Sequence, residues 1–146
     1  MKNISLYIPK LEDYWYEQKV QSDPLSMSYN AGYDVSYYGY HYDTGCIDFP
    51  KERWEDTYNR RINENRYFAY IKDNDLNEFV GYVNYHYNVN DKRYECGVLI
   101  ESKYRGKGYS REATEICGRQ VSSLCVNVLE LKLVDLPVVR IVPFVV

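Results

Sequence analysis

The chain has 146 residues, and its 18 lysines and arginines against 21 aspartates and glutamates give a formal net charge of −3 at pH 7. A hydrophobic fraction of 45% excludes global disorder, and the length predicts one domain with a sizeable core. Without a basic excess, a protein that coats nucleic-acid phosphates is not expected. No run of 18 apolar residues and no apolar signal segment occur, so we expect a cytoplasmic protein that does not enter a membrane.

The spacing of cysteine and histidine argues against a metal site. His41 and His86 are the two histidines, they have no partners at ligand spacing, and no CxxC pair occurs. We therefore expect no metal and a reducing compartment. Cys96 lacks an evident Cys–His motif and is predicted to be a small buried apolar residue rather than a nucleophile. The cysteines are Cys46, Cys96, Cys117 and Cys125.

The first 45 residues predict a strand, a helix and an irregular segment. Residues 3–8 alternate weakly before Pro9, which is typical of a short strand. Residues 28–45 hold six tyrosines and three glycines and are predicted to be largely irregular. Between them, 9–21 predicts a helix that Pro24 ends. The residues expected on its apolar face are Leu11, Tyr14, Trp15 and Gln18.

A second helix is predicted after residue 48. Asp48 is its candidate N-cap, Pro50 lies near its first turn, and 63–65 ends it. Arg60 and Arg61 are expected on a solvated face. The apolar residues at four-residue steps are Trp54, Tyr58 and Ile62.

The most regular pattern follows. Residues 67–72, 79–87 and 93–100 predict three strands of an antiparallel meander. A glycine-rich turn then leads into a helix over 109–124, and alternating leucines predict a last strand over 128–134. This order predicts an α+β domain with a mixed, mostly antiparallel sheet flanked by helices.

The candidate chemical site is the turn Arg105–Ser110, between a predicted strand and a predicted helix. Glycines at such a turn let successive N–H groups point the same way, and the helix N-terminus adds about half a positive charge. This combination binds phosphate or pyrophosphate. Arg105, Lys107 and Arg111 add positive charge at the same place.

Two known phosphate-binding patterns do not fit this turn. The Walker pattern needs four residues between its glycines, whereas Gly106 and Gly108 are two apart. The dinucleotide fingerprint needs a third glycine where Arg111 stands, and it follows a first strand rather than a fourth.

The turn does resemble the motif of the GNAT superfamily of N-acetyltransferases, Gln/Arg-x-x-Gly-x-Gly/Ala after the fourth strand. The sequence has Arg105-x-x-Gly108-x-Ser110, and Ser110 departs from the pattern while remaining small. The element order is similar to the family's over residues 1–134, although only 98–111 is specific.

The resemblance implies that acetyl-CoA is the cosubstrate and that a primary amine of a small molecule, peptide or protein attacks its thioester directly. Pantetheine would run beside the fourth strand, and a main-chain N–H near Leu99 would polarise the thioester carbonyl. The implied cofactor-binding residues are Val98, Leu99, Ile100, Arg105, Gly106, Lys107, Gly108, Tyr109, Ser110 and Arg111.

Glu95 is the candidate catalytic residue, because family members often carry a general base near the start of the fourth strand. The alternative is an ordinary solvent-facing strand residue, since a register error of one moves the side chain to the other face. His86 lies on the neighbouring predicted strand, one face of which could line an acceptor pocket. The tyrosines of 28–45 occupy the place of the family's acceptor lid, but core filling and surface positions are the favoured explanation.

The resemblance ends after 134. No tyrosine occurs in the 37 residues after Tyr109, so the general-acid tyrosine frequent in this family is not found. We expect a GNAT-like domain over 1–134 and an atypical apolar tail over 135–146. The tail is explained by a divergent closing strand, by truncation or a frame shift, or by strands from a partner chain. An apolar edge at Val138–Val146 also predicts a homodimer. A second hypothesis is an acetyl-CoA-binding module without efficient turnover.

Overall fold

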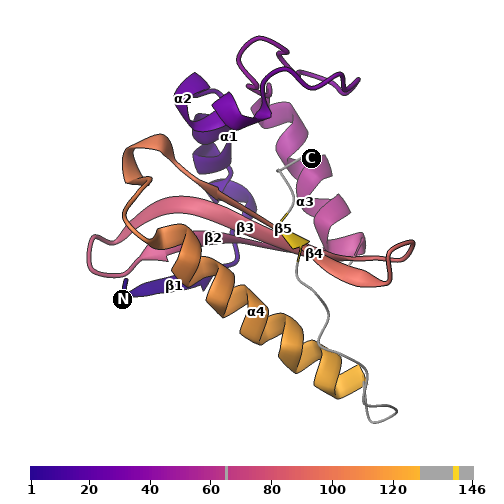
Figure 1. The fold of residues 1–146 in the computed structure, drawn as a ribbon. Helices are drawn as coiled ribbons and strands as arrows, with labels where there is room; N and C mark the ends of the chain where they lie inside the picture. Colours follow the sequence, from indigo (N-terminus) through magenta and orange to yellow (C-terminus); the bar gives the residue numbers. More distant parts are fainter. Residues whose placement is uncertain (65, 129–139, 142–146) are drawn as a thin grey trace.

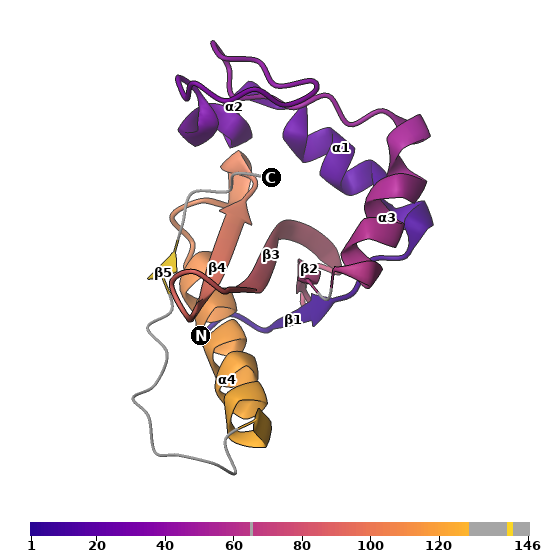
Figure 2. The same cartoon turned by 90° about the vertical axis from the view of Figure 1, so that its right-hand side faces the viewer.

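The computed structural model describes residues 1–64, 66–128 and 140–141. Their strands form one five-stranded sheet in the order β1-β2-β3-β4-β5. Helix α4 crosses one face of this sheet, and α1, α2 and α3 lie on the other side (Figure 1, Figure 2). The helix–sheet–helix layering and the order of elements confirm the predicted α+β fold.

The sheet is antiparallel from β1 to β4, and β5 runs parallel to β4. Asn77 and Lys92 take left-handed conformations, with φ of 54° and 52°, in the turns that join β2 to β3 and β3 to β4. Each of the three predicted meander strands is confirmed to within one residue at either end. The strands are β1 (Ile4–Tyr7), β2 (Tyr67–Asp73), β3 (Glu78–Asn88), β4 (Arg93–Ile100) and β5 (Arg140–Ile141).

Four α-helices accompany these strands in the described part of the chain, together with short 3-10 turns. None of the described helices has the length and apolarity needed to span a membrane. The helices are α1 (Trp15–Gln21), α2 (Pro24–Met27), α3 (Trp54–Asn63) and α4 (Tyr109–Val128).

The core has a layer on each face of the sheet, because strand side chains alternate between the faces. On β4, Cys96 and Ile100 pack against α4, whereas Leu99 packs toward α1 and α2. Tyrosine fills much of the space, and the Tyr16 and Tyr70 rings meet edge to face at 5.1 Å. Tyrosines with 2% or less of their surface exposed are Tyr14, Tyr16, Tyr70, Tyr82 and Tyr109.

The expected apolar face of the first helix is partly wrong. Trp15 is half exposed, while Glu17 and Val20 are buried. A 3-10 turn at Leu11–Asp13 precedes α1 and changes the phase of the helical repeat. Pro24 does not simply end the helix, because it opens α2 at a position where its missing N–H costs nothing.

The second predicted helix is confirmed, but its start and its buried face differ from expectation. A 3-10 turn at Lys51–Arg53 leads into α3, so Asp48 does not cap it and instead pairs with His41. Ile62 is exposed. The neighbouring Arg61, expected in solvent, is turned toward the core.

The last predicted elements also shift. Helix α4 continues to Val128, so the first residue of the predicted strand 128–134 is helical, and the rest of that strand lies outside the described residues. The strand beside β4 is instead β5, within the segment expected to be an atypical tail. Most of that tail, including most of the predicted dimer edge, also lies outside the described residues.

Candidate functional site

The loop between β4 and α4 begins with a 3-10 turn at Ser102–Tyr104 and continues through two left-handed glycines. Gly106 has a φ of 73° and Gly108 a φ of 89°, values that residues with a side chain rarely adopt. A Cβ atom at either position would meet nothing within 4 Å, so conformation rather than space requires glycine. The loop therefore presents its backbone on an open surface.

Six consecutive N–H groups of this loop, from Gly106 to Arg111, have no backbone or side-chain acceptor within the described part of the chain. The first N–H at this end of the helix with an acceptor is that of Glu112, which donates to the Gly108 carbonyl at 3.3 Å. Unpaired N–H groups at the start of a 20-residue helix carry a partial positive charge. The arrangement fits a phosphate or pyrophosphate group.

A hollow of about 530 Å³ adjoins the same helix end. Lys2, Lys107 and Arg111 bring positive charge to it, and Asp75, Glu112 and Glu115 bring negative charge. Arg111 is largely exposed and its Nε lies 3.2 Å from the Glu115 carboxylate. Lys107 and Arg111 are thus the exposed cations beside the unpaired N–H groups.

Arg105 has a different place from the one expected. Its guanidinium donates to three backbone carbonyls: Nε to Ile100 at 3.1 Å, Nη1 to Leu25 at 3.0 Å, and Nη2 to Ser26. A second contact joins the same elements, because the Ser102 N–H donates to the Ser26 hydroxyl at 2.9 Å. The hydrogen bonds of the Arg105 side chain therefore hold the loop against α2.

Tyr109, also predicted at the cofactor site, turns its ring into the core. Its hydroxyl donates to Asp73 Oδ2 at 2.6 Å, and this bond lowers the pKa of Asp73. Burial, followed by that same hydrogen bond, raises the pKa of Tyr109 to about 12. Tyr104 donates in the same way to Glu78. Tyr109 therefore contributes its main chain, and not its side chain, to the surface of the loop.

The backbone of β4 next to this loop has an inner and an outer edge. Among the described residues, β5 pairs with the outer edge only at Glu95 and Cys96. The Glu101 N–H donates to Val80 of β3, and successive N–H groups of a strand alternate in direction. The N–H groups of Val98 and Ile100 therefore point away from β3, toward the outer edge of β4, and that of Leu99 points toward β3.

Glu95 lies on the sheet face that carries α1 and α2, and its side chain is only 13% exposed. Asn88 Nδ2 donates to Glu95 Oε1 at 3.0 Å, and His86 Nε2 lies 3.4 Å from Glu95 Oε2. His86 and Glu95 are direct partners across β3 and β4. The solvent-facing interpretation of Glu95 does not describe this environment.

The remaining candidates divide between core and surface. Cys96 is fully buried, as predicted. The Tyr40 hydroxyl donates to the Asn30 carbonyl and accepts from the Tyr33 N–H. From the segment 28–45, Tyr29, Tyr37 and Tyr40 pack on the core and Tyr33, Tyr38 and Tyr42 are exposed. Core filling and surface positions therefore account for them.

Two charged contacts were missed from the sequence. Glu101, at the end of β4, is buried and accepts from Lys19 Nζ at 2.9 Å and from the Tyr16 hydroxyl at 3.3 Å. Glu17 and Arg61 form a buried pair between α1 and α3. No sequence pattern marks either contact, because the partners are 44 to 85 residues apart. Within the described ranges, no group of three or more His, Cys, Asp or Glu side chains could hold a metal ion.

A family model described as the acetyltransferase (GNAT) family matches residues 32–130. This chain belongs to the GNAT family. The matched segment includes the meander, the glycine loop and α4, so it contains the loop N–H groups and Glu95. The resemblance predicted from the loop motif is confirmed.

Solved structures of GNAT proteins share the fold. A spermidine N-acetyltransferase from Vibrio cholerae, in complex with CoA and spermine, superimposes with a TM-score of 0.59 at 17% identity, over 80% of this chain and 62% of that one. A GNAT-family acetyltransferase from Bacillus anthracis gives a TM-score of 0.53 at 20% identity, over 77% of this chain and 58% of that one. This GNAT chain thus covers less than two thirds of these relatives. No curated protein matches its sequence.

Proposed function

We propose that this GNAT protein is an N-acetyltransferase that moves an acetyl group from acetyl-CoA to a primary amine of a small molecule, peptide or protein. The observation that carries the proposal is the run of N–H groups from Gly106 to Arg111 that find no acceptor among the described residues, just after the end of β4. Backbone N–H groups at a helix N-terminus suit the pyrophosphate of such a ligand, and the outward-facing backbone groups of β4 suit its amide-containing arm.

The residues have distinct roles in this proposal. The loop N–H groups hold the pyrophosphate, and Lys107 and Arg111 add charge at the entrance. The Val98 and Ile100 backbone groups pair with the pantetheine arm, and one of their N–H groups faces the thioester oxygen. Acetyl-CoA, when bound, supplies an activated acetyl group. Glu95 takes the proton from the ammonium form of the acceptor.

The acceptor class rests on two supports. The GNAT structure from Vibrio cholerae is that of a spermidine N-acetyltransferase with spermine bound, which supports an amine as the acceptor class. In this chain, a mostly buried carboxylate at Glu95 offers a base to an ammonium group that must lose a proton before it attacks. The identity of the amine is left open.

A second candidate is a module of the same fold that binds acetyl-CoA without efficient turnover. The two candidates share the loop and the β4 edge, so binding alone does not separate them. Release of the free thiol does, because only the enzyme breaks the thioester. A calorimetric titration with acetyl-CoA therefore tests the shared part of the proposal first.

The loop offers a matched pair of variants for that titration. Gly108→Ala forces a side chain into a left-handed conformation, which costs about 1–2 kcal/mol, and we expect binding of acetyl-CoA to weaken about tenfold as the loop relaxes. Gly118→Ala is the matched control, because Gly118 lies within α4 and an added Cβ atom would have open space around it. It should leave binding unchanged and raise the free energy of unfolding by about 0.5–1 kcal/mol. Equal affinities for both variants would contradict the loop assignment.

A further inference from the structure

Two residues of β3 lie beside the carboxylate of Glu95, one at each of its oxygen atoms. Asn88 occupies Oε1 through a hydrogen bond of 3.0 Å. His86 Nε2 lies at 3.4 Å from Oε2, within ion-pair distance. Asn88 therefore fixes the carboxylate, and His86 is its neighbour on the second oxygen.

The side chains of Glu95 and His86 differ in their exposure to solvent, which affects where a proton can leave the site. Glu95 is 13% exposed, whereas His86 is 33% exposed. A proton that reaches the Glu95 carboxyl has little direct contact with water, and the imidazole beside it has more. An imidazole side chain also gains and loses a proton readily near neutral pH.

We propose that His86 is a proton relay that carries the acceptor's proton from Glu95 to solvent. This inference rests on the proposed acetyltransferase function and names a positioning residue of the same site. Because His86 works through Glu95, it does not have to touch the acceptor or acetyl-CoA.

The transfers balance without any redox step. The ammonium group of the acceptor loses one proton to the Glu95 carboxylate and becomes a neutral amine. The Glu95 carboxyl passes that proton from Oε2 to Nε2 of a neutral His86 that carries its hydrogen on Nδ1. The imidazolium then releases its Nδ1 proton to water, and Glu95 is again a carboxylate.

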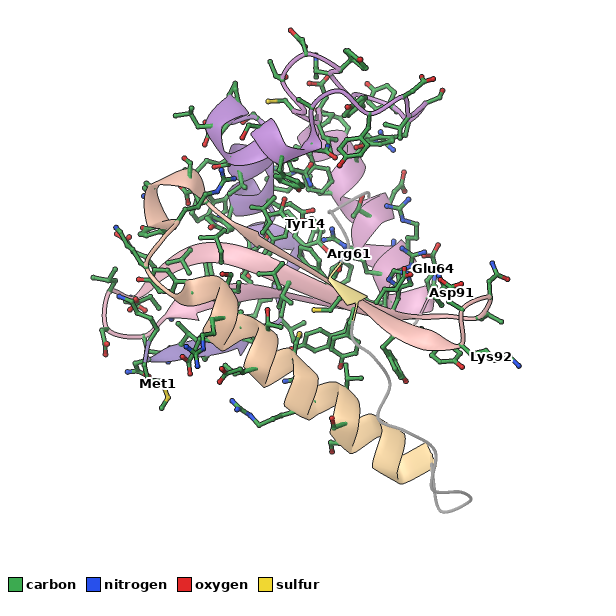
Figure 3. The ribbon with its side chains drawn as sticks, in the orientation of Figure 1. Met1, Tyr14, Arg61, Glu64, Asp91 and Lys92 are labelled. Carbon is green, nitrogen blue, oxygen red and sulfur yellow. The ribbon has the colours of Figure 1, made fainter. Side chains whose placement is uncertain are left out.

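Other charged groups lie around this pair. Asn88 Nδ2 also lies 3.5 Å from Asp91 Oδ2. Arg66 directly precedes β2 and pairs with Glu64 at 2.8 Å. In the register of the sheet, Arg140 of β5 is the partner of Glu95 on its outer edge. Glu64, Asp91 and Lys92 mark this end of the molecule in Figure 3.

The test compares the two histidines of the chain. His41 also faces a carboxylate, with Nε2 2.9 Å from Asp48 Oδ1, but this pair is about half exposed and lies outside β3 and β4. Thiol release is first established for the wild-type protein with an accepted amine. His86→Gln, His86→Ala and His41→Gln are then assayed across pH 5 to 9, with acetyl-CoA titrations to show that each variant still folds and binds.

We expect both His86 variants to lose about tenfold or more in kcat with little change in KM for acetyl-CoA. The dependence of kcat on pH should differ from that of the wild type in both variants, because the imidazole no longer takes part in the proton transfer. Added imidazole should restore part of the activity of His86→Ala. His41→Gln should resemble the wild type in all three respects.

Two results would overturn the relay. One is a wild-type kcat and pH profile in His86→Gln. The other is a loss of activity in His86→Ala that imidazole does not restore and that comes with weaker acetyl-CoA binding, as a structural role predicts. Failure of the wild-type protein itself to release thiol with any amine would count against the proposed function instead, before any variant is compared.

Discussion

Glu17 and Arg61 carry opposite charges inside the protein. Two hydrogen bonds join them, from Arg61 Nη1 to Oε2 at 2.9 Å and from Nη2 to Oε1 at 2.7 Å. Burial alone would lower the pKa of Arg61, but the Glu17 carboxylate outweighs burial and raises it. The guanidinium also lies 3.6 Å from the centre of the Phe68 ring, and Tyr14 is next to Arg61 in Figure 3. The pair joins α1 to α3 above the sheet.

Removing one partner should leave an uncompensated charge in the core. We predict that Arg61→Met lowers the free energy of unfolding by about 3–5 kcal/mol, measured by urea denaturation. Arg60→Met is the matched control, because Arg60 is exposed on the same helix and should change stability by less than about 0.5 kcal/mol. A loss below about 1 kcal/mol in Arg61→Met would show that the pair is not buried as described.

Single residues are where prediction from the sequence was weakest. The four-residue spacing of Trp54, Tyr58 and Ile62 predicted a stripe that left Arg61 in solvent, yet a charged side chain is buried when a distant partner neutralises it. Glu95 was found as a candidate from its position on the strand. Its contacts with His86 and Asn88 depend on the register between β3 and β4, which the spacing does not specify.

The loop and α4 form the element on which the proposed site depends. Arg105 joins the loop to α2, and the hydroxyl of Tyr109 joins the first residue of α4 to the end of β2. These bonds hold the backbone from both sides, so its N–H groups are in place before any ligand binds. Such preorganisation lowers the cost of ordering the loop on binding.

The contact between Tyr109 and Asp73 makes stability depend on pH at both ends of the scale. The pKa of Asp73 is lowered in the folded state, so its contribution is present above about pH 3.9 and is lost as pH falls through the lowered value. The pKa of Tyr109 is raised to about 12, so its contribution is present below about pH 10 and is lost as pH rises toward 12.

We therefore predict that Tyr109→Phe makes both limbs of the stability profile shallower, measured as the free energy of unfolding in urea from pH 2 to 11. Tyr42→Phe changes an exposed tyrosine and should leave both limbs as they are. Identical profiles for wild type and Tyr109→Phe would show that the phenol–carboxylate bond is absent in solution.

At the level of elements, the sequence predicted most of the architecture. The meander was predictable because its strands are rich in aromatic and β-branched residues and are separated by turn residues, as at Phe79–Tyr87, even though both faces of the sheet are covered. The buried face of each helix was not predictable, because the 3-10 turns before α1 and α3 shift the helical repeat by part of a turn. The end of α4 was placed too early, since Val126 to Val128 suit a strand as well as a helix.

The whole molecule combines a family fold with a chain that spans 62% or less of the two GNAT structures compared above. Membership of the family was predictable from the glycine loop, because that short motif carries both a conformation and a chemistry. The division at residue 134 and the homodimer remain predictions, as does the choice between active enzyme and binding module.

The central claim is that the chain transfers acetyl groups, and a thiol-release assay over a panel of amines tests it most directly. The panel should contain small amines, polyamines, and peptides with free α-amino or lysine groups, with hydrolysis in buffer alone as the blank. We expect thiol release above the blank with at least one class of amine, and loss of that activity in Glu95→Gln. Binding of acetyl-CoA without release over the whole panel would support the module, and absence of binding would contradict both proposals.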